Sequence, residues 1–137
     1  MGSVIAADTN ILTRYLTADD PTQFQQCQEL IESETVWISR TVALELAWVL
    51  KSRFSKTQKD IASIFLQLLE SKQLVFEQES KIHEAISLVL DGLDIADAFH
   101  LISLPDGITP LISFDKALIR KAAPHGYSVQ SPESYLN

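Results

Sequence analysis

The stretch that decides the fold is Val4-Ile5-Ala6-Ala7-Asp8-Thr9-Asn10. Its first four residues form a short apolar run, which is typical of a strand buried in a parallel sheet. The next three are residue types that start helices, because their side chains accept hydrogen bonds from free backbone N–H groups. The stretch therefore predicts a buried strand that leads directly into a helix.

The same alternation of strands and helices continues along the chain. Apolar or β-branched runs predict further strands at residues 36–39, 74–76 and 111–114, with a last edge strand at 127–129. Apolar spacing and helix-capping residues predict helices at 11–16, 21–32, 41–53, 57–69, 81–90, 95–104 and 116–122. Because parallel strands need helical crossovers, we expect one three-layer α/β/α domain over residues 1–137, with a mainly parallel sheet of four to five strands.

The composition indicates one globular domain and excludes several classes of protein. The chain has 137 residues, of which 46% are hydrophobic, enough to form a core. A net charge of −7 leaves no broad basic surface for nucleic acid or anionic membranes, so a phosphate-bearing partner must meet a few local cations. One cysteine excludes an intramolecular disulfide, and no apolar run approaches a membrane span, so we expect a cytoplasmic protein with no membrane partner.

Two carboxylates mark one edge of the predicted sheet. Asp8 and Asp115 each come one position after an apolar strand. Ligand sites in open α/β sheets form beyond the carboxyl ends of the strands, so both side chains face one crevice if the two strands are neighbours. The structural alternative for each is a simple helix cap.

Three further acids stand in or before helices. Glu45 lies within the almost wholly apolar run 42–50, which predicts a deeply packed helix with few solvent-facing directions for a charge. Asp97 is the acid in the apolar first turns of helix 95–104, where the alternative is a charge that stabilises the helix N-terminus. Asp94 is most simply the N-cap of that helix.

Taken together, these acids favour a hard divalent cation. Carboxylates that share a crevice repel one another unless a cation neutralises them. Oxygen ligands without a nearby cluster of histidines and cysteines favour Mg²⁺ or Mn²⁺ over Zn²⁺. Such an ion polarises a phosphodiester and lowers the pKa of a bound water, which indicates phosphoryl chemistry.

Four segments, in this order, resemble the PIN (PilT N-terminus) domain family: Asp8-Thr9-Asn10-Ile11-Leu12, Ser39-Arg40-Thr41-Val42-Ala43-Leu44-Glu45-Leu46, Gly92-Leu93-Asp94-Ile95-Ala96-Asp97-Ala98 and Ser113-Phe114-Asp115. The resemblance covers nearly the whole chain and is greatest to toxins of the VapC type. It implies a Mg²⁺- or Mn²⁺-dependent endoribonuclease that acts on RNA. It also implies the toxin of a type II toxin–antitoxin pair, neutralised by a small antitoxin protein and usually a homodimer.

The resemblance also implies roles for individual residues. It assigns metal binding and catalysis to Asp8, Asp97 and Asp115, with Glu45 as a ligand or as a base acting through a bound water. Asp97 ranks above Asp94, which is an additional acid or a cap. Supporting roles fall to the turn residues Thr9 and Asn10 and to the Ser113 hydroxyl, which is expected to hold a carboxylate or a water.

A few basic and aromatic side chains are candidates for RNA contacts. The cations on or next to the acid-bearing elements are Arg14, Arg40, Lys116, Arg120 and Lys121, and each could equally be a solvated surface charge. Arg14, Arg40 and Lys116 are the candidates for RNA binding. Trp37 and Trp48 stand in apolar segments, which favours core positions over platforms for base stacking.

Two other classes of protein stay open at this point. Phosphatases with an aspartate nucleophile after the first strand share the α/β layout, but they need a second acid two residues later, where this chain has Asn10. The second alternative is a non-catalytic PIN-fold module that binds RNA or protein. The complete set of acids favours a metal-dependent nuclease over this module.

Overall fold

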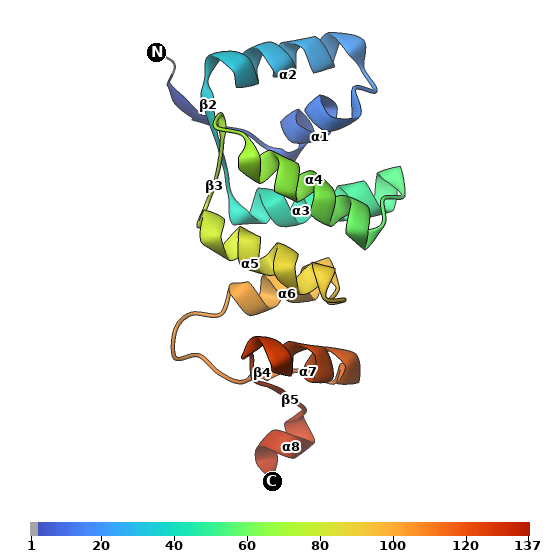
Figure 1. Ribbon diagram of the computed structural model, residues 1–137, viewed down its shortest axis with the longest axis vertical. Coiled ribbons are helices and arrows are strands. Elements are labelled where there is room, and N and C mark those ends of the chain that lie inside the picture. The colour runs from blue at the N-terminus through green and yellow to red at the C-terminus, as the bar shows by residue number, and fades with distance from the viewer. Residues whose placement is uncertain (1–2) are drawn as a thin grey trace.

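The computed structural model describes residues 3–137 and shows helices alternating with parallel strands, consistent with the predicted three-layer α/β/α class (Figure 1). The predicted domain, 1–137, begins two residues before the described ones. In chain order the elements are β1 (Val4–Ala6), α1 (Thr9–Thr17), α2 (Pro21–Ser33), β2 (Thr35–Ile38), α3 (Arg40–Phe54), α4 (Gln58–Glu70), β3 (Leu74–Phe76), α5 (Glu79–Leu90), α6 (Ile95–Ile102), β4 (Leu111–Ile112), α7 (Lys116–Ala122), a 3-10 turn (Ala123–His125), β5 (Val129–Gln130) and α8 (Pro132–Leu136). The chain runs from β1 at one end of an elongated molecule to α8 at the other (Figure 1).

The strands pair in parallel, as expected, but within residues 3–137 they form two sheets where the sequence predicted one. The first sheet has the order β1-β2-β3, and the second joins β4 to β5. The single sheet is corrected because β4 and β5, of two residues each, pair with one another, and within residues 3–137 neither pairs with a strand of the first sheet.

Two polar contacts fasten the C-terminal elements to α5. The Tyr127 hydroxyl donates a hydrogen bond to Glu84, and His125 Nε2 lies 3.1 Å from a carboxylate oxygen of Asp91. Burial, and then the bond to Glu84, raise the pKa of Tyr127, so the hydroxyl stays protonated and able to donate. These contacts position β5 and α7 relative to the end of α5.

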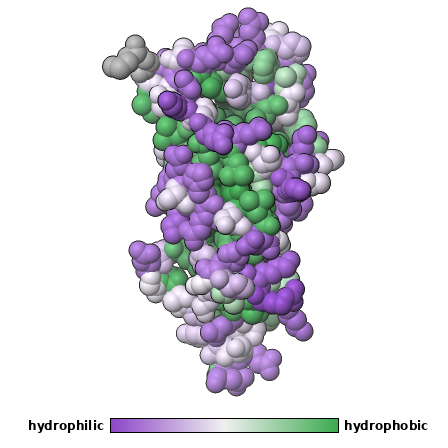
Figure 2. Space-filling view, viewed as in Figure 1, coloured by the Kyte–Doolittle hydropathy of each residue, from purple (hydrophilic) through white to green (hydrophobic). Residues whose placement is uncertain are grey.

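The main core lies between the first sheet and the helices that follow it. Phe65 on α4 is fully buried, and its ring centroid lies 6.1 Å from that of Phe76 and 6.5 Å from that of Phe99. These three rings join α4, β3 and α6, which explains why those elements pack closely. On the face drawn in Figure 2, hydrophobic residues gather midway along the molecule, where α4 and α5 lie side by side.

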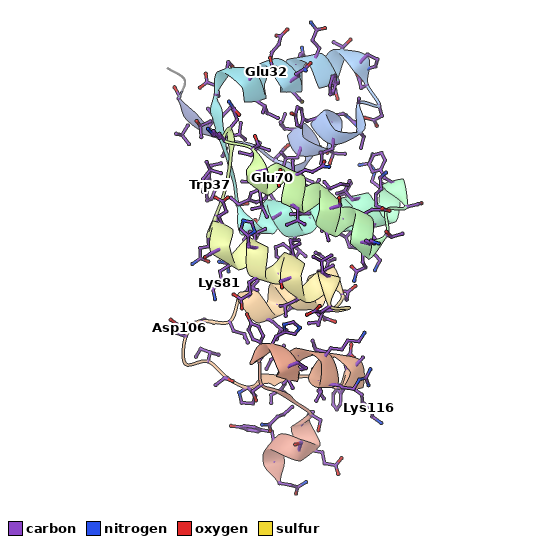
Figure 3. The ribbon with its side chains drawn as sticks, in the orientation of Figure 1. Glu32, Trp37, Glu70, Lys81, Asp106 and Lys116 are labelled. Atoms are coloured by element: carbon purple, nitrogen blue, oxygen red, sulfur yellow. The ribbon has the colours of Figure 1, made fainter. Side chains whose placement is uncertain are left out.

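Helix α3 is packed on one side only, which corrects two expectations. Its buried residues are Ala43, Leu46, Ala47, Val49 and Leu50. Glu45 and Trp48 are three positions apart and therefore share a face, and that face is exposed, with Trp48 63% accessible. Trp37 is also exposed, because it stands on the opposite side of β2 from the buried Val36 and Ile38 (Figure 3).

Within residues 3–137, none of the helices is long and apolar enough to cross a membrane.

Candidate active site at the start of helices α6 and α7

Asp94 and Asp97 occupy the first turn of α6 but have different surroundings. Asp94 is the N-cap, and one carboxylate oxygen accepts a hydrogen bond from the Ala96 backbone N at 3.0 Å. Its other oxygen lies 3.5 Å from Lys51 Nζ. Asp97 is half-buried one turn later, and within residues 3–137 no donor satisfies its carboxylate. The prediction that Asp94 caps this helix is confirmed, and Asp97 is the acid that is free to act.

Asp115 reaches the same region from the end of β4. It is the N-cap of α7, with Oδ1 accepting from the Leu118 backbone N at 3.0 Å. Its own backbone N donates to Ser113 Oγ at 3.0 Å. Ser113 therefore holds the turn that presents Asp115 and contacts the backbone of this residue.

A pocket of about 200 Å³ brings Asp94, Asp97 and Asp115 together. Lys121 is the cation on its wall, and its Nζ donates to the Gly92 backbone oxygen at 3.0 Å. The pocket therefore combines three carboxylates with an amine that is already held by the backbone.

Gln58 is a pocket residue that sequence reasoning missed. Its side-chain Nε2 donates to the Leu93 backbone oxygen at 2.9 Å, and its Oε1 accepts from the Ile95 backbone N at 3.1 Å. These two bonds fix the loop that leads into α6. No sequence signal could have found this role, because a glutamine at the start of an amphipathic helix is an ordinary surface residue.

The charges in the pocket act on Asp97. Its pKa is raised above the usual value of 3.8, first because the carboxyl is partly desolvated, and second because Asp94 and Asp115 are negative. The positive charge of His100 opposes this rise. A bound cation would relieve the repulsion among the three acids.

We expect this shift to make the metal-free protein less stable as the pH rises. The raised pKa means that Asp97 holds its proton more tightly in the folded than in the unfolded state. Protonated Asp97 therefore contributes stability that is fully present below the pKa of the unfolded state. This contribution is lost as the pH rises through the pKa of the folded state. Urea unfolding in EDTA, from about pH 4 to about pH 7, should show the parent losing stability relative to Asp97→Asn. A pH-independent difference would contradict this expectation.

Asp8 lies in a different cavity, so the structure does not bring it to Asp97 and Asp115. It caps α1, with Oδ1 accepting from the backbone N of Asn10 at 3.0 Å and of Ile11 at 3.3 Å. The cavity between α1 and α2 measures about 620 Å³. A crevice shared by Asp8 and Asp115 required β1 and β4 to be neighbours, and in this structure they are in separate sheets.

The other predicted residues are dispersed. Thr9 is buried in the first turn of α1, and Glu45 is exposed on α3. Arg14 is paired with Asp19 at 3.0 Å, and Lys116 is exposed at the start of α7 (Figure 3). Nothing in these positions tests the assigned roles, which stay predictions.

The donor chemistry of the pocket fits a hard divalent cation. Mg²⁺ is usually held by one or two carboxylates together with waters and substrate phosphates, and Asp97 and Asp115 provide two carboxylates. Among residues 3–137, no group of three or more His, Cys, Asp and Glu side chains is arranged to hold a metal ion. A cation here would therefore keep part of its shell as water.

Comparison with known proteins identifies the family. The model of the PIN domain matches residues 5–124, most of the chain. No curated protein matches the chain significantly. The PIN domain is generally a nuclease fold, and its members commonly bind divalent metals. The chain, with its acids at the starts of α6 and α7, therefore belongs to the PIN domain family.

Proposed function

We propose that this protein is a metal-dependent endoribonuclease that hydrolyses RNA phosphodiester bonds in the pocket of Asp94, Asp97 and Asp115. The observation that carries the proposal is Asp97, a half-buried carboxylate that shares a pocket with two other carboxylates in a PIN domain and accepts no hydrogen bond from residues 3–137. Partly dry acids of like charge are tolerated mainly where a cation binds. This arrangement supports a metal-dependent hydrolase over a simple structural cluster.

In this proposal each pocket residue has a distinct task. Asp97 and Asp115 would hold Mg²⁺ or Mn²⁺, which when bound supplies an activated water and polarises the phosphodiester. Asp94 caps α6 and pairs with Lys51, so it fixes the helix that carries Asp97. Gln58 fixes the preceding loop, and rigid support of this kind keeps the ligands in position.

We extend the proposal to the toxin of a type II toxin–antitoxin pair, neutralised by a small antitoxin. The support is the resemblance of the four acid-bearing segments to VapC-type toxins, and a homodimer and the metal-binding roles of Asp8 and Glu45 rest on the same resemblance. A cytoplasmic location rests on the single cysteine, Cys27, which is buried and unpaired.

One observation favours a second candidate, a non-catalytic PIN-fold module that binds RNA or protein. Asp8 lies in another cavity and Glu45 is exposed on α3, so the pocket contains only part of the predicted catalytic set. A module of this kind would keep the fold without a working metal site.

Cleavage of a labelled mixed RNA pool separates these candidates. We expect cutting with Mg²⁺ or Mn²⁺, none in EDTA, and a loss of more than about tenfold in Asp115→Asn. Asparagine caps helices as well as aspartate does, so this variant keeps the start of α7. Asp106→Asn, in an exposed loop, is the matched control and should cut like the parent. Cutting that survives in EDTA contradicts the proposal. If the protein neither cuts RNA nor binds Mn²⁺ by calorimetry, the module is favoured.

A further inference from the structure

A small hollow lies between the start of α3 and the end of α6. It measures about 100 Å³ and is lined by Arg40, Thr41, Leu44, Phe99, His100 and Ser103. Four of these side chains carry hydrogen-bond donors, and none is an acid. In a chain with a net charge of −7, a hollow of this composition is a local site for an anion.

Arg40 has unused donors in this hollow. Its Nε is buried and finds no hydrogen-bond partner among residues 3–137, and its Nη1 donates to Ser103 Oγ at 3.3 Å. Among residues 3–137 no carboxylate forms an ion pair with its guanidinium, although Glu77 accepts a bond from its backbone N at 2.9 Å. Buried donors in proteins nearly always have a partner, which for this Nε would be a water or a ligand with acceptor oxygens. A guanidinium matches the geometry of a phosphate group better than any other side chain.

The hollow lies next to the carboxylate pocket along one helix. His100 follows Asp97 by three positions, which places both on the same side of α6. The rise from Asp97 to Ser103 is about 9 Å, since a helix advances about 1.5 Å per residue. A strand bound at the carboxylate pocket can therefore place a neighbouring phosphate in the hollow.

We propose that this hollow, which we name the Arg40 hollow, binds a phosphodiester of the RNA substrate. This phosphodiester lies in the strand bound at the carboxylate pocket and is not the bond that is cleaved. Arg40 and His100 donate to its oxygens, and the hydroxyls of Thr41 and Ser103 complete the contact. The inference rests on the proposed function, because it adds a positioning site for the same RNA substrate. It also assigns a function to His100, Thr41 and Ser103, which the sequence did not distinguish from ordinary helix residues.

The test is RNA binding without cleavage. A single-stranded 2′-O-methyl RNA, in EDTA, is titrated by fluorescence anisotropy at salt concentrations from about 50 to about 300 mM. We expect Arg40→Gln to bind several-fold more weakly and to lower the slope of log affinity against log salt by about 0.7, the value for one phosphate contact on a single strand. Arg40→Lys should restore the slope but only part of the affinity, since it keeps the charge and loses the planar fork.

Arg53→Gln is the matched control, an exposed arginine in the last turn of the same helix that contacts Phe54. Its affinity and slope should equal those of the parent. His100→Gln carries the test if Arg40→Gln does not fold, because His100 is exposed. Parent-like affinity and slope in well-folded Arg40→Gln, or parent-like affinity in well-folded His100→Gln, would overturn the proposal.

The outcomes also distinguish this proposal from the proposed nuclease activity. Arg40-dependent RNA binding without cleavage in any metal supports the hollow and contradicts the nuclease. Parent-like binding and metal-dependent cleavage by Arg40→Gln supports the nuclease and contradicts the hollow. A parent that binds no RNA in EDTA contradicts the hollow, and one that also cuts no RNA with Mg²⁺ or Mn²⁺ contradicts both. Inorganic phosphate that shifts the His100 ring signals in NMR, without RNA binding, identifies a site for free anions and overturns the phosphodiester assignment.

Discussion

Asp97→Asn is expected to lower the rate of metal-dependent RNA cleavage by more than about a hundredfold, the largest effect on activity that we predict. Residues that only support a metal ligand typically contribute about ten- to a hundredfold, and Asp97 is assigned as a ligand itself. Its carboxylate is half-buried and free of hydrogen bonds from protein donors in residues 3–137, so it is available to a cation. The measurement is the single-turnover rate with Mn²⁺, together with Mn²⁺ affinity by calorimetry.

Asp94→Asn is the matched control for this variant. Asp94 lies on the same pocket, but its oxygens already interact with the Ala96 backbone N and with Lys51. Asparagine preserves the cap, so we expect the rate to stay within about tenfold of the parent. Equal losses in the two variants, or full activity in Asp97→Asn, would contradict the ranking of Asp97 above Asp94.

Phe65→Ala is expected to have the largest effect on stability. The ring is fully buried and packs against Phe76 and Phe99, so its removal leaves a cavity that three elements cannot easily close. A substitution of this kind costs about 3–5 kcal/mol, a large part of the roughly 5–15 kcal/mol by which domains are stable. Urea unfolding followed by circular dichroism measures the loss.

The neighbouring residue on α4 provides the control for Phe65→Ala. Leu66 is 37% exposed, so Leu66→Ala is expected to cost less than about 1 kcal/mol. If both variants lost the same stability, the assignment of the main core to the Phe65 cluster would be wrong.

Local signals in the sequence predicted the local structure well. The apolar run before Asp8 forms β1, and Asp8, Asp94 and Asp115 all cap the helices that follow them. The predicted burial of that strand is wrong, because Val4 and Ala6 are exposed in β1. Each of these outcomes depends on a few consecutive residues, because a cap is a hydrogen bond across two or three positions. The fold class follows from the same alternation.

Features that depend on distant contacts could not be predicted in this way. The apolar run around Glu45 indicated deep burial, yet neighbours in a helical sequence point in different directions, and Glu45 lies on the exposed side with Trp48. The division into two sheets depends on which strands pair, and no pattern within a single element encodes that choice. Asp97 and Asp115 nevertheless meet. Asp97 lies in the first turn of α6, Asp115 caps α7, and the starts of both helices border the same pocket.

The order of strands in the first sheet has a consequence for how the protein is made on the ribosome. β2 pairs with β1 and β3 pairs with β2, so each new strand can join the sheet soon after it emerges. The pocket is different, since Asp94 and Asp97 must wait until the segment with Asp115 and α7 has been synthesised. During translation the first sheet can thus form before the pocket does. The acids of the pocket stay apart in the growing polypeptide until α7 has been synthesised and packs beside α6.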